Sequence, residues 1–405
     1  MLKRYFLNQK KRNFSTASIW IKGGSDMDSI GKKGINKILC SLLTRGCEGF
    51  DNYVLSEFIE SHGAELNQEV FEDGISISLK SLNEHFSKLL PLIDLIINKP
   101  ILSEVEFQKV KKSSFDLIKK DKENPFIKCF ENWRKIVYSN HPYAFSTIGN
   151  ANDVSKINYE DILFEFKNFK SRDKFIISNN SEIKGENLKT LNQKNQKEKP
   201  CLINSDLDTL QRFDSASNES YQTIMMIGNQ TCSRRSNEYL PFKVLESYLS
   251  YGMSAALFKI FREKYGITYD LGVFNPVRSG NAPFLIYLSV SNKNALFAFE
   301  LLSSLWKNLL LNPLSDNEIV LAKEKLKGSF LLNDQSLDEI LQRKIQLLSY
   351  GIQPNSENYL NSKIEEISSL DILELTKKYF SKPFLSISGN KKICSTISDL
   401  WKKNF

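Results

Sequence analysis

The feature that most constrains the fold of this chain is an internal repeat. Matched positions recur in the same order in the two halves, at spacings of 206 to 213 residues. A single match of this kind could arise by chance, but an ordered series at one spacing indicates duplication. The chain is therefore predicted to contain two copies of one domain. The matches are 38–46 with 244–252, Pro100 with Pro313, Ser103 with Ser315, 161–163 with 371–373, and 175–178 with 385–388.

The boundary between the two domains is predicted from composition. Residues 181–200 carry five lysines, three glutamates and few apolar side chains, which is typical of an exposed linker. We therefore expect domains at 1–182 and 209–405, joined by a linker at 183–208. Each copy mixes helical patterns with short alternating segments such as 75–82, so the expected class is α+β with mainly antiparallel sheets.

Composition and charge exclude several classes of protein. The content of 41% hydrophobic and 25% charged residues is that of a soluble globular protein, and the longest apolar run, 89–97, is too short to span a membrane. The basic amino terminus has no apolar stretch behind it, so we expect no secretory signal. The net charge of +8 comes from basic residues interleaved with acids, which argues against nucleic-acid binding. Six scattered cysteines without a Cys-x-x-Cys pair predict reduced thiols and a cytoplasmic location.

The stretch 252–271 has the pattern of a functional segment. It follows an amphipathic helical run, and Gly252 and Gly266 each predict a break in helical structure. Arg262 and Tyr269 lie seven residues apart on either side of Gly266. The second break can therefore direct both side chains into one space.

This stretch resembles the second-domain signature of the insulinase/pitrilysin family of zinc peptidases. The resemblance implies two related α+β domains that clasp around a chamber. It also implies that Arg262 and Tyr269 donate hydrogen bonds to the substrate carbonyl and to the oxyanion that develops on it. Residues 56–79 resemble the family's helix, Gly, Leu-Asn and edge-strand segment, which makes Asn67 the match of an Asn near the substrate backbone.

The zinc motif of active family members is missing from the corresponding helix, predicted at 34–46. Active members carry His-x-x-Glu-His, in which two imidazoles bind zinc and the Glu activates the bound water. The matching positions here are Lys37, Cys40 and Ser41. The region of the third ligand holds Asp116, and one carboxylate without imidazoles is a poor zinc site. We therefore expect no metal in this chain.

The individual residues also have simpler interpretations. An apolar stripe of Ile35, Ile38, Leu39, Leu42 and Leu43 predicts the buried face of this helix, with the three motif positions off the stripe. A nucleophilic role for Cys40 is disfavoured because no His is near it in sequence. Lys37 either takes the place of the metal charge or is solvated, and solvation is favoured. His62, before a Gly, is interpreted as a residue at a helix carboxyl end rather than a metal ligand.

Taken together, the resemblance implies a protein that retains the substrate-binding residues of the second domain but lacks the zinc motif of the first. Such subunits occur in bacterial heterodimeric members, where a paralogue carries the zinc. The chain is thus expected to be no enzyme alone, but to complete the active site of a zinc-bearing paralogue that cuts peptides or unfolded polypeptides. The alternatives are an autonomous zinc peptidase with unusual ligands, a structural module, and a peptide-binding protein that acts alone.

Overall fold

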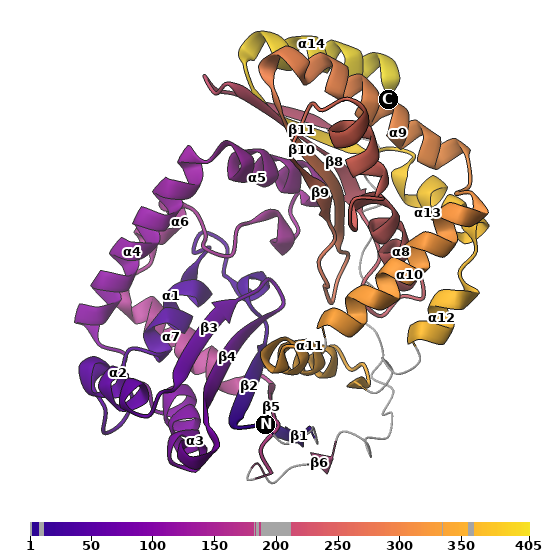
Figure 1. Cartoon of the computed structure of the whole chain (residues 1–405). Helices are drawn as coiled ribbons and strands as arrows, with labels where there is room; N and C mark the ends of the chain where they lie inside the picture. Colours follow the sequence, from indigo (N-terminus) through magenta and orange to yellow (C-terminus); the bar gives the residue numbers. More distant parts are fainter. Residues whose placement is uncertain are drawn as a thin grey trace. The chain divides into compact units, whose positions relative to one another are not determined.

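The chain folds into two compact units, each built on one β-sheet (Figure 1). Unit 1 comprises Met1–Lys120, Phe145–Lys197 and Asn333–Glu357, and unit 2 comprises Asp121–Ala144, Glu198–Leu332 and Asn358–Phe405. This computed structural model describes residues 2–7, 12–181, 183, 186–187, 212–333, 335–354 and 360–405. The predicted linker at 183–208 therefore lies almost entirely outside the described residues.

The sheet of unit 1 has the strand order β3-β4-β2-β5-β1-β6. Pairing is antiparallel from β3 to β5, and parallel where β1 joins β5 and β6. Among the described strands β3 pairs only with β4, so it forms an edge of the sheet. The strands are β1 (Leu2–Phe6), β2 (Phe14–Lys22), β3 (Glu65–Val70), β4 (Gly74–Leu82), β5 (Lys174–Ser178) and β6 (Glu186–Asn187).

The sheet of unit 2 repeats this arrangement in the order β9-β10-β8-β11-β7. Its pairs are antiparallel except for β11 with β7, which corresponds to β5 with β1. The shared strand order confirms the predicted duplication and the mainly antiparallel α+β class. The strands are β7 (Phe213–Ser217), β8 (Gln222–Gln230), β9 (Asp270–Phe274), β10 (Pro283–Ser291) and β11 (Phe384–Gly389).

The helices repeat in the same way. Capping boxes open α7 at Asn158 and Asp161, and α13 at Ser368 and Asp371, 210 residues apart. Unit 1 contains α1 (Ile35–Leu43), α2 (Asn52–Ser61), α3 (Asn83–Asn98), α4 (Glu104–Glu123), α6 (Ala151–Lys156), α7 (Tyr159–Ser171) and α11 (Leu337–Ser349). Unit 2 contains α5 (Pro125–Tyr138), α8 (Tyr239–Ser250), the π-helix η5 (Phe258–Lys264), α9 (Ala295–Leu311), α10 (Asp316–Asn333), α12 (Leu360–Glu366), α13 (Ser369–Phe380) and α14 (Lys391–Asn404).

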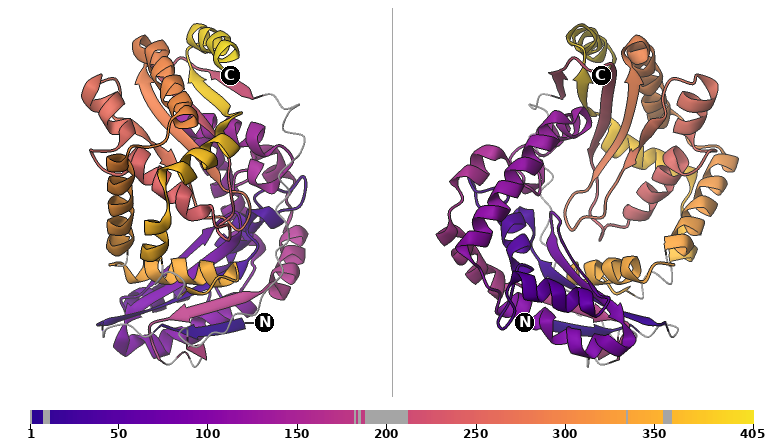
Figure 2. Two further views of the ribbon diagram at one scale, coloured as in Figure 1. Left: turned by 90° about the vertical axis from the view of Figure 1, so that its right-hand side faces the viewer. Right: turned by 60° about the vertical axis from the view of Figure 1, so that its left-hand side comes forward.

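One helix from each half of the chain packs on the sheet of the other half (Figures 1 and 2). Helix α5 lies on β8 and β11, where the Trp133 indole N–H donates to the Phe384 carbonyl at 3.3 Å. Helix α11 lies on β2 and β5, where the Thr16 hydroxyl donates to Asp338 at 2.9 Å. The compact units therefore differ from the consecutive segments 1–182 and 209–405, because each sheet buries one face against a helix contributed by the other half.

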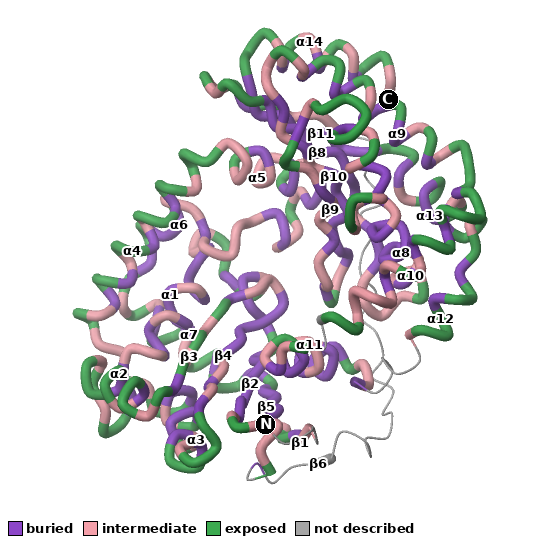
Figure 3. The backbone as a smooth tube through the Cα atoms, in the orientation of Figure 1, coloured by how far each residue is buried: buried purple, intermediate pink, exposed green. Residues whose placement is uncertain are grey.

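The remaining face of each sheet is covered by helices of its own half, and burial follows this layering (Figure 3). In unit 1 the apolar stripe of α1 is buried as predicted, at 0–3% exposure for all five residues. In unit 2 the largest core side chains, among them Trp306 and Phe380, stack between α9 and α13. In the described parts of the chain we find no helix whose length and hydropathy suit it to cross a membrane.

Candidate functional site

The helix that would carry a zinc motif, α1, is fixed by a buried carboxylate in the loop after β2. Asp28 accepts hydrogen bonds from the backbone N–H groups of Gly34 (2.7 Å) and Asn36 (3.1 Å), and from the Asn36 side-chain amide (2.8 Å). Gly34 begins the helix at φ +98°, a left-handed conformation that glycine adopts without steric cost. The start of α1 is therefore held in one place although no metal motif follows.

The three motif positions on α1 have different environments. Cys40 is completely buried although it lies off the apolar stripe, because α1 packs against both β3 and α7 and more than one of its faces is covered. Burial raises the pKa of the Cys40 thiol to about 12, although the charge of Lys37 opposes this. The Ser41 hydroxyl donates to the Lys37 carbonyl at 3.0 Å, one turn back in the helix. Lys37 is half-buried, and its ammonium contacts no hydrogen-bonding partner among the described residues.

No cluster of three or more metal-ligating side chains occurs in the described residues. Asp116 lies on the exposed side of α4. His62 caps the carboxyl end of α2, where its Nδ1 lies 2.7 Å from the Phe58 carbonyl. That position agrees with its interpretation as a helix-terminal residue.

Asn67 lies in a polar cavity of about 580 Å³ on the α11 face of the unit 1 sheet. The edge strand β3 places Asn67 opposite Ser78 of β4, and Ser78 in turn lies opposite Ser18 of β2. Asn67 is exposed, and none of the described residues hydrogen-bonds its side-chain amide. The cavity therefore combines a free strand edge with a row of small polar side chains beside it.

The far wall of this cavity is α11, which the sequence did not point to as part of the site. Asp338, Glu339, Gln342, Arg343 and Gln346 line it, and the Ser76 hydroxyl donates to Gln342 at 2.6 Å. The only signal that could have found α11 is the repeat, because α5 and α11 begin 212 residues apart. That signal shows an equivalent helix, but not the sheet on which it packs.

Arg262 and Tyr269 lie side by side in unit 2, as the break at Gly266 predicts. The guanidinium carbon of Arg262 is 5.1 Å from the centroid of the Tyr269 ring and 4.9 Å from that of Phe258. Gly266 has φ +60°, which turns the chain from η5 towards the edge strand β9. Both side chains are exposed, Tyr269 at 81%, so their polar ends are accessible from solvent. η5 is a π-helix. Such helices are rare in proteins, and those that occur are often found at functional sites.

The repeat aligns the motif helix with a buried ion pair in unit 2. At the spacing of 206 residues, Lys37 corresponds to Lys243 (37 + 206) and Cys40 to Glu246 (40 + 206). The Lys243 ammonium donates to Glu246 and to the Asn275 carbonyl, both at 2.7 Å, and the Asn275 amide donates to Glu246 at 3.1 Å. Burial alone would lower the pKa of Lys243, but Tyr239 and Glu246 together raise it. In unit 2 this position therefore holds a satisfied charge pair.

Comparison with known proteins places both halves of the chain in one family. Residues 5–151 match the insulinase family (peptidase family M16), and residues 175–326 match the peptidase M16 inactive domain. An uncharacterized zinc protease of Rickettsia bellii is 22% identical over 381 residues, covering 89% of this chain and 88% of the relative. The uncharacterized zinc protease YmxG of Bacillus subtilis is 21% identical over 387 residues, covering 92% of this chain and 93% of the relative.

Solved structures agree with the fold. A peptidase M16 inactive domain from Pseudomonas fluorescens superimposes on this chain with a TM-score of 0.80 at 19% sequence identity. A protease from Helicobacter pylori superimposes with a TM-score of 0.82 at 14% sequence identity. Each comparison covers 95% of both chains. The two matched segments cover most of the sequence in the order of the two units. The chain is therefore a member of the insulinase family, peptidase family M16, with a C-terminal domain of the inactive type.

Proposed function

We propose that this chain is the non-catalytic subunit of a heterodimeric, processing-peptidase-like metallopeptidase of the insulinase family. Its partner is a zinc-motif-bearing paralogue, which supplies the metal and the activated water. This chain supplies Arg262 and Tyr269, which hold the substrate carbonyl, and Asn67, which binds the peptide backbone. The substrates are peptides or unfolded polypeptides, and the complex works in the cytoplasm.

The observation that carries this proposal is the contrast between the two sets of site residues. Arg262 and Tyr269 are exposed and adjacent, with a guanidinium and a hydroxyl accessible from solvent. A charged donor and a neutral donor side by side suit an oxygen atom that gains negative charge. By contrast, the motif positions on α1 hold a buried thiol and a hydroxyl that bonds to its own helix.

The edge strand β3 supports a peptide as the substrate class. An extended peptide can add to an unpaired strand edge through main-chain hydrogen bonds, while pockets beside the strand select its side chains. Asn67 lies on this edge next to the polar cavity. The same observation favours a second candidate function, a peptide-binding protein that acts alone.

Reconstitution separates the two candidates. The purified chain is mixed with the zinc-motif paralogue from the same genome, the mixture is analysed by size-exclusion chromatography, and hydrolysis of a quenched fluorescent peptide is followed. The proposal predicts a complex and activity well above that of either protein alone. A mixture with no complex and no gain over the paralogue contradicts it. Saturable binding of a labelled unfolded peptide by the chain alone would then favour the solitary binding protein.

A further inference from the structure

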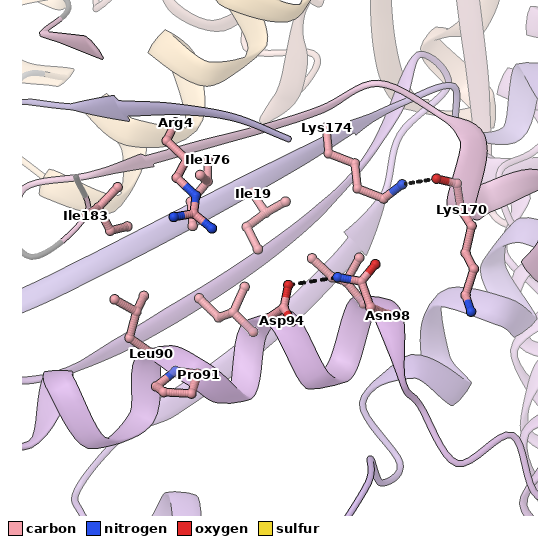
Figure 4. A pocket seen from close by; sticks show the side chains of 12 residues that line it. Arg4, Ile19, Leu90, Pro91, Asp94, Asn98, Lys170, Lys174, Ile176 and Ile183 are labelled. Carbon is pink, nitrogen blue, oxygen red and sulfur yellow. Dashed lines mark hydrogen bonds between the residues drawn. The ribbon is translucent and has the colours of Figure 1, made fainter. Parts of the chain in front are cut away.

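A second cavity lies on the opposite face of the unit 1 sheet, under α3 (Figure 4). Helix α3 packs on β4 and β2, but the sheet continues past β2 to β5 and β1. Between the carboxyl-terminal half of α3 and these strands remains a space of about 520 Å³, a volume typical of small-molecule sites. This cavity is separate from that of Asn67, because α11 and α3 cover different faces of the sheet.

The walls of the cavity are mainly aliphatic. Ile19 of β2 and Ile176 of β5 form the sheet side, and both are at least 95% buried. Ile93 and Ile97 of α3 face them, and Ile183 closes the end beyond β5. Such a surface favours a hydrocarbon group over water by roughly 25 cal/mol for each Å² that the group buries.

The side chain of Arg4 extends over this apolar space. In β1 the side chains alternate, and Tyr5 belongs to the cluster under α11, so Arg4 is on the α3 face. Figure 4 shows the Arg4 guanidinium reaching from the strand into the space above α3. Among the described residues, none forms a hydrogen bond or an ion pair with it. A guanidinium beside an apolar wall, with no protein anion bound to it, is a ready binding group for a planar carboxylate.

The other charged groups of the cavity leave an excess of positive charge. Lys174 is buried, and its ammonium donates to the carbonyls of Phe169 (3.0 Å), Lys170 (2.9 Å) and Arg172 (3.2 Å), none of which neutralises it. Asp94, the one carboxylate among the described residues of the lining, accepts a hydrogen bond from the Asn98 amide at 2.8 Å. With Arg4, Lys170 and Lys174 against Asp94, the lining is positively charged and favours an anionic ligand.

We propose that this cavity binds a small aliphatic carboxylate, with the carboxylate on Arg4 and the hydrocarbon chain against the isoleucines of β2, β5 and α3. The site lies within unit 1 and is independent of the peptidase role. A bound ligand would connect strand β1 to α3 across a space that the protein leaves unfilled.

Isothermal titration of the full chain with decanoate, below its micelle concentration, tests the proposal. The chain offers a matched control, because Lys3 is next to Arg4 on the same strand but lies over the Phe175 ring on the α11 face. We expect saturable binding to the wild type that Arg4→Gln weakens by roughly tenfold to a hundredfold, the value of a charge-assisted hydrogen bond, while Lys3→Gln leaves it unchanged. Decanol, which lacks the charge, should bind as weakly to the wild type as decanoate binds to Arg4→Gln.

A second variant tests the position of the hydrocarbon chain. Leu90 is a half-buried residue at the cavity wall, so Leu90→Trp fills the space with little disturbance of the core. It should abolish decanoate binding while circular dichroism shows the wild-type fold. Absence of saturable binding to the wild type, equal weakening by Arg4→Gln and Lys3→Gln, or unchanged binding to a folded Leu90→Trp would each overturn the proposal.

Discussion

The guanidinium of Arg262 lies over the ring of Tyr269, 5.1 Å from its centroid, at the point where a π-helix gives way to an edge strand. A cation held over an aromatic face gains about 0.5–1 kcal/mol at an exposed site. That stabilisation positions both side chains while their polar ends stay accessible. Both polar groups are therefore held side by side and open to solvent, as the proposed function requires.

The substitution Tyr269→Phe removes the hydroxyl and keeps the aromatic ring, so it tests the two groups separately. The phenyl ring still stacks with Arg262, and because Tyr269 is 81% exposed, the free energy of unfolding should change by less than about 0.5 kcal/mol. The kcat of the reconstituted complex should fall by roughly a hundredfold or more, the usual cost of losing one oxyanion donor. Tyr265→Phe, which removes the hydroxyl of a neighbouring tyrosine, is the matched control and should retain full activity. Equal activity of the two variants would exclude a role for the Tyr269 hydroxyl.

Cys40 should be inert in the native protein. It is completely buried, and burial raises its thiol pKa to about 12, so the reactive thiolate is scarce at neutral pH. Mass spectrometry after iodoacetamide treatment should find Cys40 unmodified in the native chain and modified in urea. Ser41→Cys, one position further on the half-buried side of α1, should be alkylated in the native state. Rapid native alkylation of Cys40 would reopen its role as a nucleophile.

Removing one partner of the buried pair of Lys243 and Glu246 should strongly destabilise unit 2. Lys243→Met leaves a buried carboxylate without its cation, which typically costs about 3–5 kcal/mol of unfolding free energy. The double variant Lys243→Met, Glu246→Leu should recover much of this loss, because no uncompensated charge remains. Lys378→Met breaks the more exposed pair with Glu238 and should cost less than about 1 kcal/mol. Denaturant unfolding of the four proteins measures these values, and a double variant no better than the single would contradict the account.

Asp26 should make unit 1 less stable as the pH rises. Burial and, next, the nearby Asp73 raise its pKa from 3.8 to about 6. Between these values the folded state retains a proton that the unfolded state has released, so stability is lost as the pH rises through this window. Asp26→Asn cannot ionise, and its unfolding free energy relative to wild type should increase by about 1–3 kcal/mol between pH 4 and pH 7. A difference that stays flat between pH 4 and pH 7 for Asp26→Asn would contradict the assignment.

The sequence was sufficient for those parts of the fold and site that depend on local pattern. The repeat predicted two related sheets, and the capping residues at Asn158 and Ser368 recur at the spacing it implied. The proximity of Arg262 and Tyr269 followed from the break at Gly266, because a left-handed glycine changes the direction of the chain at that point. Their role in a reaction is still a prediction.

The parts that depend on the choice of packing partner could not be predicted. An amphipathic pattern shows that α5 and α11 each bury one face, but not that each does so on the sheet of the other half. For the same reason the wall of the Asn67 cavity was missed, and the sequence did not decide whether Cys40 lies on the helix surface or is buried. The cavity beneath Arg4 is formed by residues of several strands and helices, none of which carries a motif.

The most direct test of the proposed function is the kcat of the reconstituted complex with substitutions at Arg262. Arg262→Ala should lower kcat by roughly a hundredfold to a thousandfold, and Arg262→Lys should lie between alanine and wild type because it keeps the charge but not the planar fork. Lys264, which lies on the same π-helix over the Tyr265 ring, offers the matched control Lys264→Ala, and its activity should equal that of the wild type. If Arg262→Ala and Lys264→Ala both cut the peptide as fast as the wild-type complex, this chain does not complete its partner's active site.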